Sequence, residues 1–255
     1  KRLIVQPNTF NMYCHREPRF YLTVVWNGQW FKWENRNTNF LYGGPDGGPT
    51  HDAPQNGYLN RSRVSLDYIP RDNNHPYRPA IIFRMAEAYL SYAEALNESS
   101  ERMSHKQEIL DNLNKIRHRA GIAEYGTGTD ENGFTRIKIN FSDQKEVRRL
   151  IHKERRVEFV GEGVRYHDLR RWKTAHYGIG NLNEQGENPD WGVNGPDYGM
   201  NYYGTEYTDQ GDNAFFKRTK YMDRVYPRKF YWYPIHQSEI DKDPTLVQGP
   251  FWLGE

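Results

Sequence analysis

The sequence predicts a mainly α-helical protein, in which tetratricopeptide-like helix pairs carry a loop-rich, irregular region with a small β-hairpin. Two observations lead to this prediction. Residues 79–175 place apolar side chains at helical spacing. Residues 1–78 and 176–255 are rich in Gly, Pro, Asn and Tyr, and most of their length shows no periodicity. Because a helix pair of this size cannot bury its apolar face alone, neighbouring pairs are expected to stack.

The first predicted element is a β-hairpin over residues 20–33. Residues 20–26 and 29–33 flank Asn27-Gly28, a pair that favours a type I′ turn. Because side chains alternate between the two faces of a strand, one face of the hairpin would be apolar and turn toward the core. This face consists of Phe20, Leu22, Val24, Trp26, Phe31 and Trp33. Trp30 belongs to the opposite, mixed face and is therefore expected to meet water or a ligand.

The next two predicted elements are helices. The first covers residues 82–97, where apolar side chains recur at helical spacing. The second begins at Ser104 and Gln107, which form a capping-box pattern, and ends at Gly121. A short connection makes these two helices antiparallel neighbours.

Two further helices and an aromatic loop region complete the chain. The third helix is expected from about residue 142 to Gly161 or Gly163, and a short fourth helix from 166 to 175. The stretch that follows is irregular and rich in tyrosine. Since disordered segments are poor in aromatic residues, this stretch is expected to be functional or packed by its own side chains.

Composition and charge argue against several classes of protein. A net charge of +2, from 35 basic and 33 acidic residues, is too balanced for a nucleic-acid-binding protein. The mean hydropathy of −1.00 argues against an integral membrane protein. The single cysteine, Cys14, cannot form an internal disulfide. The first residues resemble neither a signal peptide nor an initiator methionine, so the N-terminus is expected to be a cut end.

Four segments resemble the SusD/RagB family, in order and at fitting spacing. The first is EPRF at 17–20. The others are RMAEAYLSYAEALN at 84–97 with LNKIRHRAG at 113–121, then ERRVEF at 154–159 with EGVRYHDLRRW at 162–172, and finally YPIHQSEI at 233–240 with DPTLVQ at 243–248. One such segment would be a weak signal, but four in order over most of the chain are specific.

The resemblance implies a surface lipoprotein on the extracellular face of a Bacteroidetes outer membrane. It implies that the protein captures oligosaccharide without catalysis, uses no cofactor and works with a SusC-like TonB-dependent transporter. The chain would be the family's C-terminal half, and the lipid anchor would belong to the absent N-terminal half. Cys14 cannot be the lipidated cysteine, because no apolar signal segment precedes it.

A cluster of charged residues in the third and fourth helices has two interpretations. Two facing carboxylates are what glycoside hydrolysis requires. Interleaved arginines would instead keep these acids ionised, which is the opposite of a general acid. We therefore expect a structural ion-pair network that joins the two helices, made of Glu154, Arg155, Glu158, Arg165, Asp168 and Arg170.

The loop aromatics are the candidate ligand-binding residues. A sugar ring presents an apolar C–H face and several hydroxyls, so its site needs an aromatic platform beside hydrogen-bonding groups. Of the candidates, Trp30 is the first choice because of its place in the hairpin. The candidates are Trp30, Trp33, Tyr42, Trp191, Tyr202 and Tyr203.

Metal sites and other functions remain as alternatives. No metalloprotease, P-loop or dinucleotide motif occurs, and only Asp209 and Asp212 suggest a surface calcium ion. Within the same architecture, the ligand could be a peptide rather than a glycan. A glycoside hydrolase domain would need two unpaired carboxylates in one cleft. A purely structural helix scaffold would pack its loop aromatics against one another.

Overall fold

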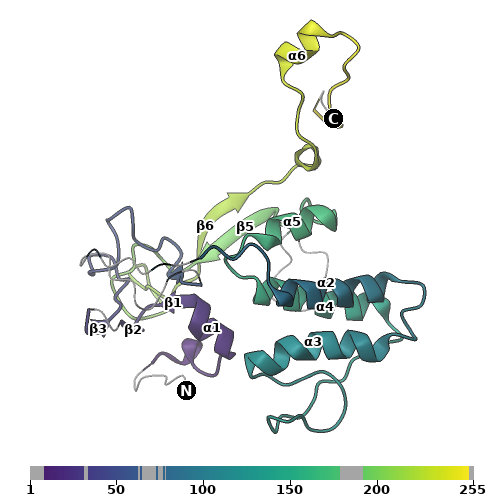
Figure 1. Ribbon diagram of the computed structural model, residues 1–255. Coiled ribbons are helices and arrows are strands. Elements are labelled where there is room, and N and C mark those ends of the chain that lie inside the picture. Colours follow the sequence, from purple (N-terminus) through teal and green to yellow (C-terminus); the bar gives the residue numbers. More distant parts are fainter. Residues whose placement is uncertain are drawn as a thin grey trace. The chain divides into compact units, whose positions relative to one another are not determined.

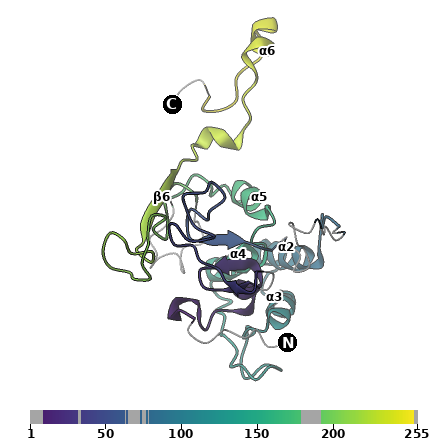
Figure 2. The same ribbon diagram turned by 90° about the vertical axis from the view of Figure 1, so that its left-hand side faces the viewer.

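The computed structural model describes residues 9–31, 34–62, 64, 73, 77, 79–178 and 192–252. The chain forms two compact units (Figures 1 and 2). Unit 1 consists of Lys1–Gly163 and Tyr198–Thr219, and unit 2 of Val164–Asp197 and Lys220–Glu255. No helix in the described ranges is long and apolar enough to cross a membrane.

The protein is mostly helical, with a few short strand pairs. The helices are α1 (Pro18–Thr23), α2 (Met85–Glu98), α3 (Lys106–Ala120), α4 (Gln144–Glu158), α5 (Val164–Arg171) and α6 (Gln237–Lys242), with short 3₁₀ turns at Asn11–Tyr13 and Arg228–Tyr231. The strands are β1 (Val24–Trp26), β2 (Trp30–Phe31), β3 (Arg36–Asn37), β4 (Tyr58–Asn60), β5 (Gly195–Gly199) and β6 (Thr219–Arg224). They pair as β1–β4, β2–β3 and β5–β6.

Helices α2, α3 and α4 form the scaffold of unit 1 (Figure 1). Helix α2 packs against both α3 and α4, which confirms that the first two predicted helices are neighbours. Their contact is made by fully buried side chains at helical spacing, namely Leu90, Ala93, Ile109, Leu113, Ile116, Val147 and Ile151. The apolar periodicity of the sequence therefore located this core correctly.

Helix ends follow local chemistry where a cap forms. The backbone of Gly121 adopts the left-handed conformation (φ +68°) that ends α3, as predicted. The carboxylate of Asp143 accepts hydrogen bonds from the backbone N–H groups of Lys145 and Glu146 and so begins α4. The predicted capping box at Ser104 is wrong, because its hydroxyl donates to the Glu101 carbonyl and α3 begins only at Lys106.

Two other predicted boundaries differ from the structure. Helix α2 begins at Met85, so Ile82 precedes the helix and is exposed instead of joining the buried stripe. Helix α5 ends at Arg171 rather than at residue 175, and Lys173 has a positive φ of 57°. A residue in that left-handed conformation cannot continue a right-handed helix.

The predicted hairpin over residues 20–33 is wrong in its first strand. Residues Pro18–Thr23 form α1, and proline suits the first turn of a helix. The Asn27-Gly28 turn is present, since Gln29 N–H donates to the Trp26 carbonyl (3.2 Å). The chain beyond it pairs differently: β1 lies antiparallel to β4, and β2 lies antiparallel to β3.

The helical conformation of α1 also reverses two predicted faces. Tyr21 is buried and Leu22 is exposed, opposite to the alternation expected of a strand. Phe31 is also exposed, and Trp33 lies outside the described residues. The turn is bonded to residues that follow it in the chain. Asn27 Oδ1 accepts from the backbone N–H of Phe40 (2.7 Å), and Gly28 N–H donates to the Thr38 carbonyl (2.9 Å).

Aromatic side chains build the core of the irregular part of unit 1. One cluster centres on Tyr13, Tyr21 and Trp26. A second contains Phe40, Met200 and Phe215, and thereby joins residues near position 40 to the segment after residue 198. Such rings bury a large area each, so a loop-rich region can hold one conformation without long strands.

Candidate ligand-binding site

Three of the predicted ligand-binding residues come together on the irregular part of unit 1. The ring centroids of Tyr202 and Tyr203 are 5.0 Å apart, and those of Tyr42 lie 6.0 Å and 5.6 Å from them. The side chain of Tyr203 is 70% exposed, and the other two are half-buried. We call Tyr42, Tyr202 and Tyr203 the tyrosine cluster.

The loop that carries Tyr42 is held by an ion pair and backbone bonds. Arg36 donates two hydrogen bonds to the carboxylate of Asp46 (2.6 and 2.8 Å), and the same carboxylate accepts from the backbone of Asn39 (2.9 Å). Burial alone would raise the pKa of Asp46, but these donors outweigh it and hold the pKa below its ordinary value. The loop therefore has a charged anchor at neutral pH.

The turn that carries the other two tyrosines is built around Asn201. This buried side chain donates to the carbonyls of Asp212 (3.0 Å) and Ala214 (3.1 Å) and accepts from the backbone of Tyr203 (3.1 Å). Asn201 was not among the predicted site residues. In the sequence, Asn201 shows only the spacing of an Asx turn, in which an asparagine side chain accepts a hydrogen bond from the backbone N–H two residues later.

The two loops are fastened to each other directly beside the rings. Tyr42 N–H donates to the Gly204 carbonyl (2.9 Å), which joins the backbones of the two loops. Gly48 lies beneath the rings: a Cβ atom there would come within 2.6 Å of Tyr202 and 2.8 Å of Tyr42. Only glycine allows the rings to approach the backbone this closely.

The tyrosine cluster presents apolar ring surface together with hydroxyl groups. The hydroxyl of Tyr202 donates to the Thr50 carbonyl (3.4 Å), so it is oriented by the loop. Ring faces can pack against the C–H face of a sugar, and phenol hydroxyls both donate and accept hydrogen bonds. This chemistry suits an uncharged ligand with an apolar face and several hydroxyls.

The remaining predicted aromatics are not part of the described cluster. Trp30 is exposed on β2, opposite Asn37 of β3. The Arg36–Asp46 pair ties β3 to the loop that carries Tyr42. Trp33 and Trp191 lie outside the described residues.

Tyr207 is linked to the loop that carries Tyr42, although it was not among the predicted site residues. Its hydroxyl donates to Asn39 Oδ1 (3.2 Å), and its ring packs against Phe10 with centroids 5.4 Å apart. Asn39 thus links this tyrosine to the anchored loop. Its sequence signal was only its place in the tyrosine-rich stretch.

Glu154 and Glu158, two members of the predicted ion-pair network, are buried in unit 1 and surrounded by arginines. Arg19 Nη1 is 2.6 Å from Glu154 and 3.1 Å from Glu158, and Arg117 Nη1 is 2.8 Å from Glu154. Arg84 and Arg119 also pair with Glu158.

These guanidinium groups decide the charge of Glu158. Burial would raise the pKa of its carboxyl, but hydrogen bonds from Arg119 and Arg84 outweigh burial and lower it. A carboxylate held in this way stays ionised and cannot act as a general acid at neutral pH. The partners Arg19, Arg84, Arg117 and Arg119 were not predicted, although all four lie in the segments that carry the family resemblance.

The other predicted network members have separate contacts. Arg155 Nε lies 3.9 Å from Glu94. In unit 2, Asp168 pairs with Arg171 (3.0 Å), and Arg170 donates to the Tyr231 carbonyl (2.7 Å). Arg165 also belongs to unit 2, where it lines a cavity beside α5. The link between the third and fourth predicted helices stays a prediction.

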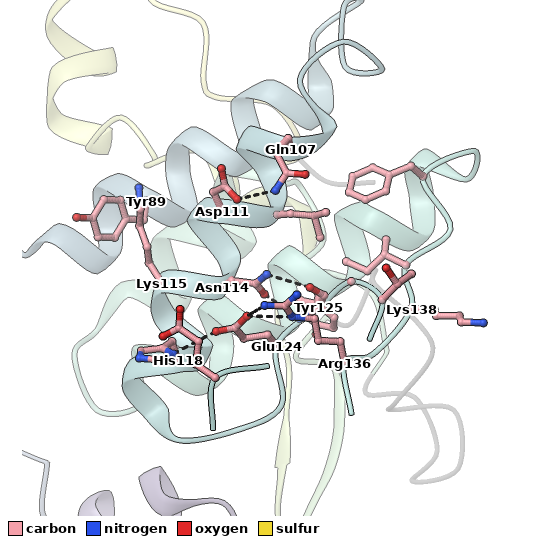
Figure 3. A pocket seen from close by; sticks show the side chains of 16 residues that line it. Tyr89, Gln107, Asp111, Asn114, Lys115, His118, Glu124, Tyr125, Arg136 and Lys138 are labelled. Atoms are coloured by element: carbon pink, nitrogen blue, oxygen red, sulfur yellow. Dashed lines mark hydrogen bonds and ion pairs between the residues drawn. The ribbon is translucent and has the colours of Figure 1, made fainter. Parts of the chain in front are cut away.

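A groove of about 940 Å³ lies along α3 in unit 1 (Figure 3). Its polar side chains bond to one another: His118 and Arg136 flank Glu124, and Gln107 donates to Asp111. Its aromatic wall is covered in part, because Lys115 Nζ lies 4.5 Å from the ring centre of Tyr89. The groove therefore offers a sugar less free ring surface than the tyrosine cluster does.

Metal ligands do not gather among the residues that the structure describes. Asp212, one of the two residues that suggested calcium, lies 3.0 Å from Lys217 Nζ. The carboxylate of Asp130 accepts hydrogen bonds from the backbone N–H groups of Glu124, Asn132 and Phe134, so it holds together the loop in which it lies.

A helical scaffold with aromatic side chains on anchored loops defines the class of fold, a mainly α-helical protein with a loop-rich region. The chain belongs to the SusD family, whose sequence profile matches residues 5–252. This is a binding, non-catalytic family of surface-associated outer-membrane lipoproteins, known for nutrient and glycan binding and for working with SusC-like transporters. The resemblance of the four segments is thereby confirmed.

Individual relatives agree with this assignment. The SusD-like proteins P25 and P38 of Formosa agariphila are each 32% identical to the chain, over 109 and 103 residues, which are 43% and 40% of this chain and 18% and 19% of those proteins. A crystal structure of a SusD-like protein from Bacteroides fragilis is 26% identical with a TM-score of 0.64. The match covers 94% of this chain and 40% of the solved one.

Proposed function

We propose that this protein binds oligosaccharide at the bacterial cell surface and delivers it to a SusC-like TonB-dependent transporter. The observation that carries the proposal is the tyrosine cluster: three rings from two loops, brought together and anchored from beneath. Membership of a binding, non-catalytic family supports it. Attachment to the outer membrane through a lipid anchor outside these 255 residues belongs to the same proposal.

Each part of the site has a role in this proposal. Tyr203, the most exposed ring, stacks on a sugar, while Tyr42 and Tyr202 form the side of the platform. Asn201 and Gly48 position the rings without touching the ligand. Because the rings are held in place before binding, less conformational entropy is lost on association.

Replacement of Tyr203 by alanine tests the site. Tyr203→Ala should weaken oligosaccharide binding by about 1–2 kcal/mol, roughly ten- to thirtyfold in Kd, since buried aromatic anchors dominate such interfaces. Isothermal titration with plant, fungal and host oligosaccharides measures it. The control is Tyr177→Ala, which removes an exposed tyrosine from unit 2 and should leave the affinity unchanged.

The sequence-based first choice, Trp30, is tested in the same titrations. Trp30→Ala should also weaken binding without unfolding the chain, if the ligand extends from the cluster across β2. Unchanged affinity in both Tyr203→Ala and Trp30→Ala would refute this location of the site. Heat from peptides and none from any glycan would instead support peptide capture.

A further inference from the structure

The two chain segments that carry the tyrosine cluster share an acidic composition. Residues 37–60 contain Tyr42, and residues 198–216 contain Tyr202 and Tyr203. Neither segment contains lysine or arginine, although the whole chain has 35 basic residues and a net charge of +2. The carboxylates of the two segments are Asp46, Asp52, Glu206, Asp209 and Asp212. The candidate site is therefore built from acidic segments of a chain whose overall charge is slightly positive.

Hydrogen bonds place the backbone of Asp52 close to the cluster. The hydroxyl of Tyr202 donates to the Thr50 carbonyl (3.4 Å), and the same carbonyl accepts from Ala53 N–H (3.2 Å). Asp52 lies inside the turn that the second bond closes. Its side chain is 88% exposed, and its carboxylate lies 3.4 Å from Nε2 of His51. An exposed carboxylate thus lies one short turn away from the ring of Tyr202.

Glu206 is held near the junction of the two segments. At this junction, Tyr42 N–H donates to the Gly204 carbonyl (2.9 Å). Glu206 follows two residues later, where its N–H donates to the Asn213 carbonyl (3.0 Å) and its own carbonyl accepts from Phe215 N–H (2.9 Å). The residue is exposed. Two residues span at most about 7 Å, which is less than the Debye length of about 8 Å at physiological ionic strength.

Two cations that border these segments are already paired with carboxylates. Arg36 donates two hydrogen bonds to Asp46 (2.6 and 2.8 Å), and Lys217 Nζ lies 3.0 Å from Asp212. Proteins recognise carboxylate and sulfate groups mainly through the guanidinium fork of arginine or the ammonium of lysine. An acidic ligand would therefore have to compete with Asp46 or Asp212 for these two cations.

Charges placed in this way discriminate between ligands. Exposed charges interact appreciably when they lie within about one Debye length of each other. Like charges that are brought together suppress the wrong partner, whereas an uncharged ligand has no such penalty. A protonated amine would instead be attracted. The acidic residues therefore change the selectivity of the tyrosine cluster more than its affinity for an uncharged sugar.

We propose that the tyrosine cluster selects its ligand by charge: it admits uncharged and amine-bearing oligosaccharides and rejects those that carry carboxylate or sulfate groups. Asp52 and Glu206 are the residues that determine this selectivity. The rings supply the stacking surface, and the two carboxylates set the sign of the potential that an approaching sugar meets. The inference rests on the proposed function, because it requires that the cluster binds oligosaccharide.

Oligosaccharide pairs that differ only in charge test the selectivity. Tetragalacturonate and its methyl ester share one backbone and differ in their carboxylates, and chitosan tetramer differs from N-acetylchitotetraose in its free amines. These pairs are titrated by calorimetry at low salt, together with a panel of neutral, uronic-acid and sulfated oligosaccharides from plants, fungi and hosts. We expect each acidic glycan to bind on the order of tenfold more weakly than its uncharged counterpart.

The outcomes distinguish a failure of this inference from a failure of the proposed function. Heat confined to uncharged and amine-bearing glycans supports the charge selectivity. An acidic glycan that binds as tightly as its uncharged counterpart, or that is the strongest binder of the panel, overturns the selectivity and leaves the proposed function intact. If no glycan gives heat, the proposed function fails and this inference fails with it.

Charge reversal at one residue gives a second measurement in the same pairs. Asp52→Lys should reduce the ratio between the Kd values of the acidic and uncharged members to about threefold, because it removes a repulsive charge and adds an attractive one. The matched control is Glu131→Lys, the same change of charge at an exposed residue in the loop beside α3. Raising the salt concentration should also narrow the ratio in the wild type, since salt screens exposed charges. Equal ratios in the two variants would overturn the role of Asp52.

Discussion

At the level of single residues, Glu158 has the most consequential environment in unit 1. Its side chain is 2% exposed and pairs with Arg19, Arg84 and Arg119. Taking a carboxylate out of water is unfavourable unless its partners are well placed. Removing the charge would therefore take one carboxylate partner away from three guanidinium groups at once.

Replacement of this carboxylate measures that environment. Glu158→Gln should lower the free energy of unfolding by about 3–5 kcal/mol, the usual effect of breaking a buried ion pair. Urea denaturation followed by circular dichroism measures the change. Glu98→Gln removes a partly exposed partner of Arg148 and should change stability by about 1 kcal/mol or less. Equal effects of the two substitutions would contradict the buried role of Glu158.

Gly48 shows how one residue without a side chain can shape the tyrosine cluster, the candidate binding site. Gly48→Ala should displace the rings of Tyr42 and Tyr202, and overpacking of this kind destabilises by about 1–3 kcal/mol. We expect weaker oligosaccharide binding in titration calorimetry. Gly178→Ala is the matched control, because the nearest atom to its added Cβ would lie 3.8 Å away. Wild-type affinity in Gly48→Ala would show that the ring positions do not matter for binding.

Among the elements, α4 depends on a local cap that can be tested alone. Asp143→Ala should destabilise unit 1 by about 1 kcal/mol, since the N-cap carboxylate satisfies two backbone N–H groups. Thermal unfolding by circular dichroism measures the loss. Ser104→Ala is the comparison: its hydroxyl caps no helix, so a smaller change is expected. A larger loss in Ser104→Ala would restore the predicted capping box.

The elements near residue 25 show why strand pairing was predicted wrongly. Asn27-Gly28 does form a turn, and two-residue turns often join paired strands. Here α1 replaces most of the first strand, and β1 (Val24–Trp26) pairs with β4 (Tyr58–Asn60), which lies much later in the chain. Arg19 extends from α1 to Glu154, 135 residues away. A contact at that separation leaves no signal in local periodicity.

For the whole molecule, the buried carboxylate of Glu158 contributes to the way stability changes with pH. The pKa of Glu158 is lower in the folded state than in the unfolded state, so its contribution is fully present above the unfolded value of about 4.3. That contribution should be lost as the pH falls below this value toward the folded pKa. Urea midpoints between pH 7 and pH 3 should fall less steeply in Glu158→Gln than in the wild type. Parallel curves would contradict the assigned cause.

The sequence by itself determined the helical scaffold, the core faces of α2, α3 and α4, the glycine end of α3 and the family. These features depend on residues within a few positions of one another, where spacing and capping operate. Only the tertiary structure decided that Tyr42 meets Tyr202 and Tyr203, that β1 pairs with β4, and which arginines surround Glu158. Each of these joins segments far apart in the chain, and such contacts are selected by the packing of the folded whole rather than by local pattern.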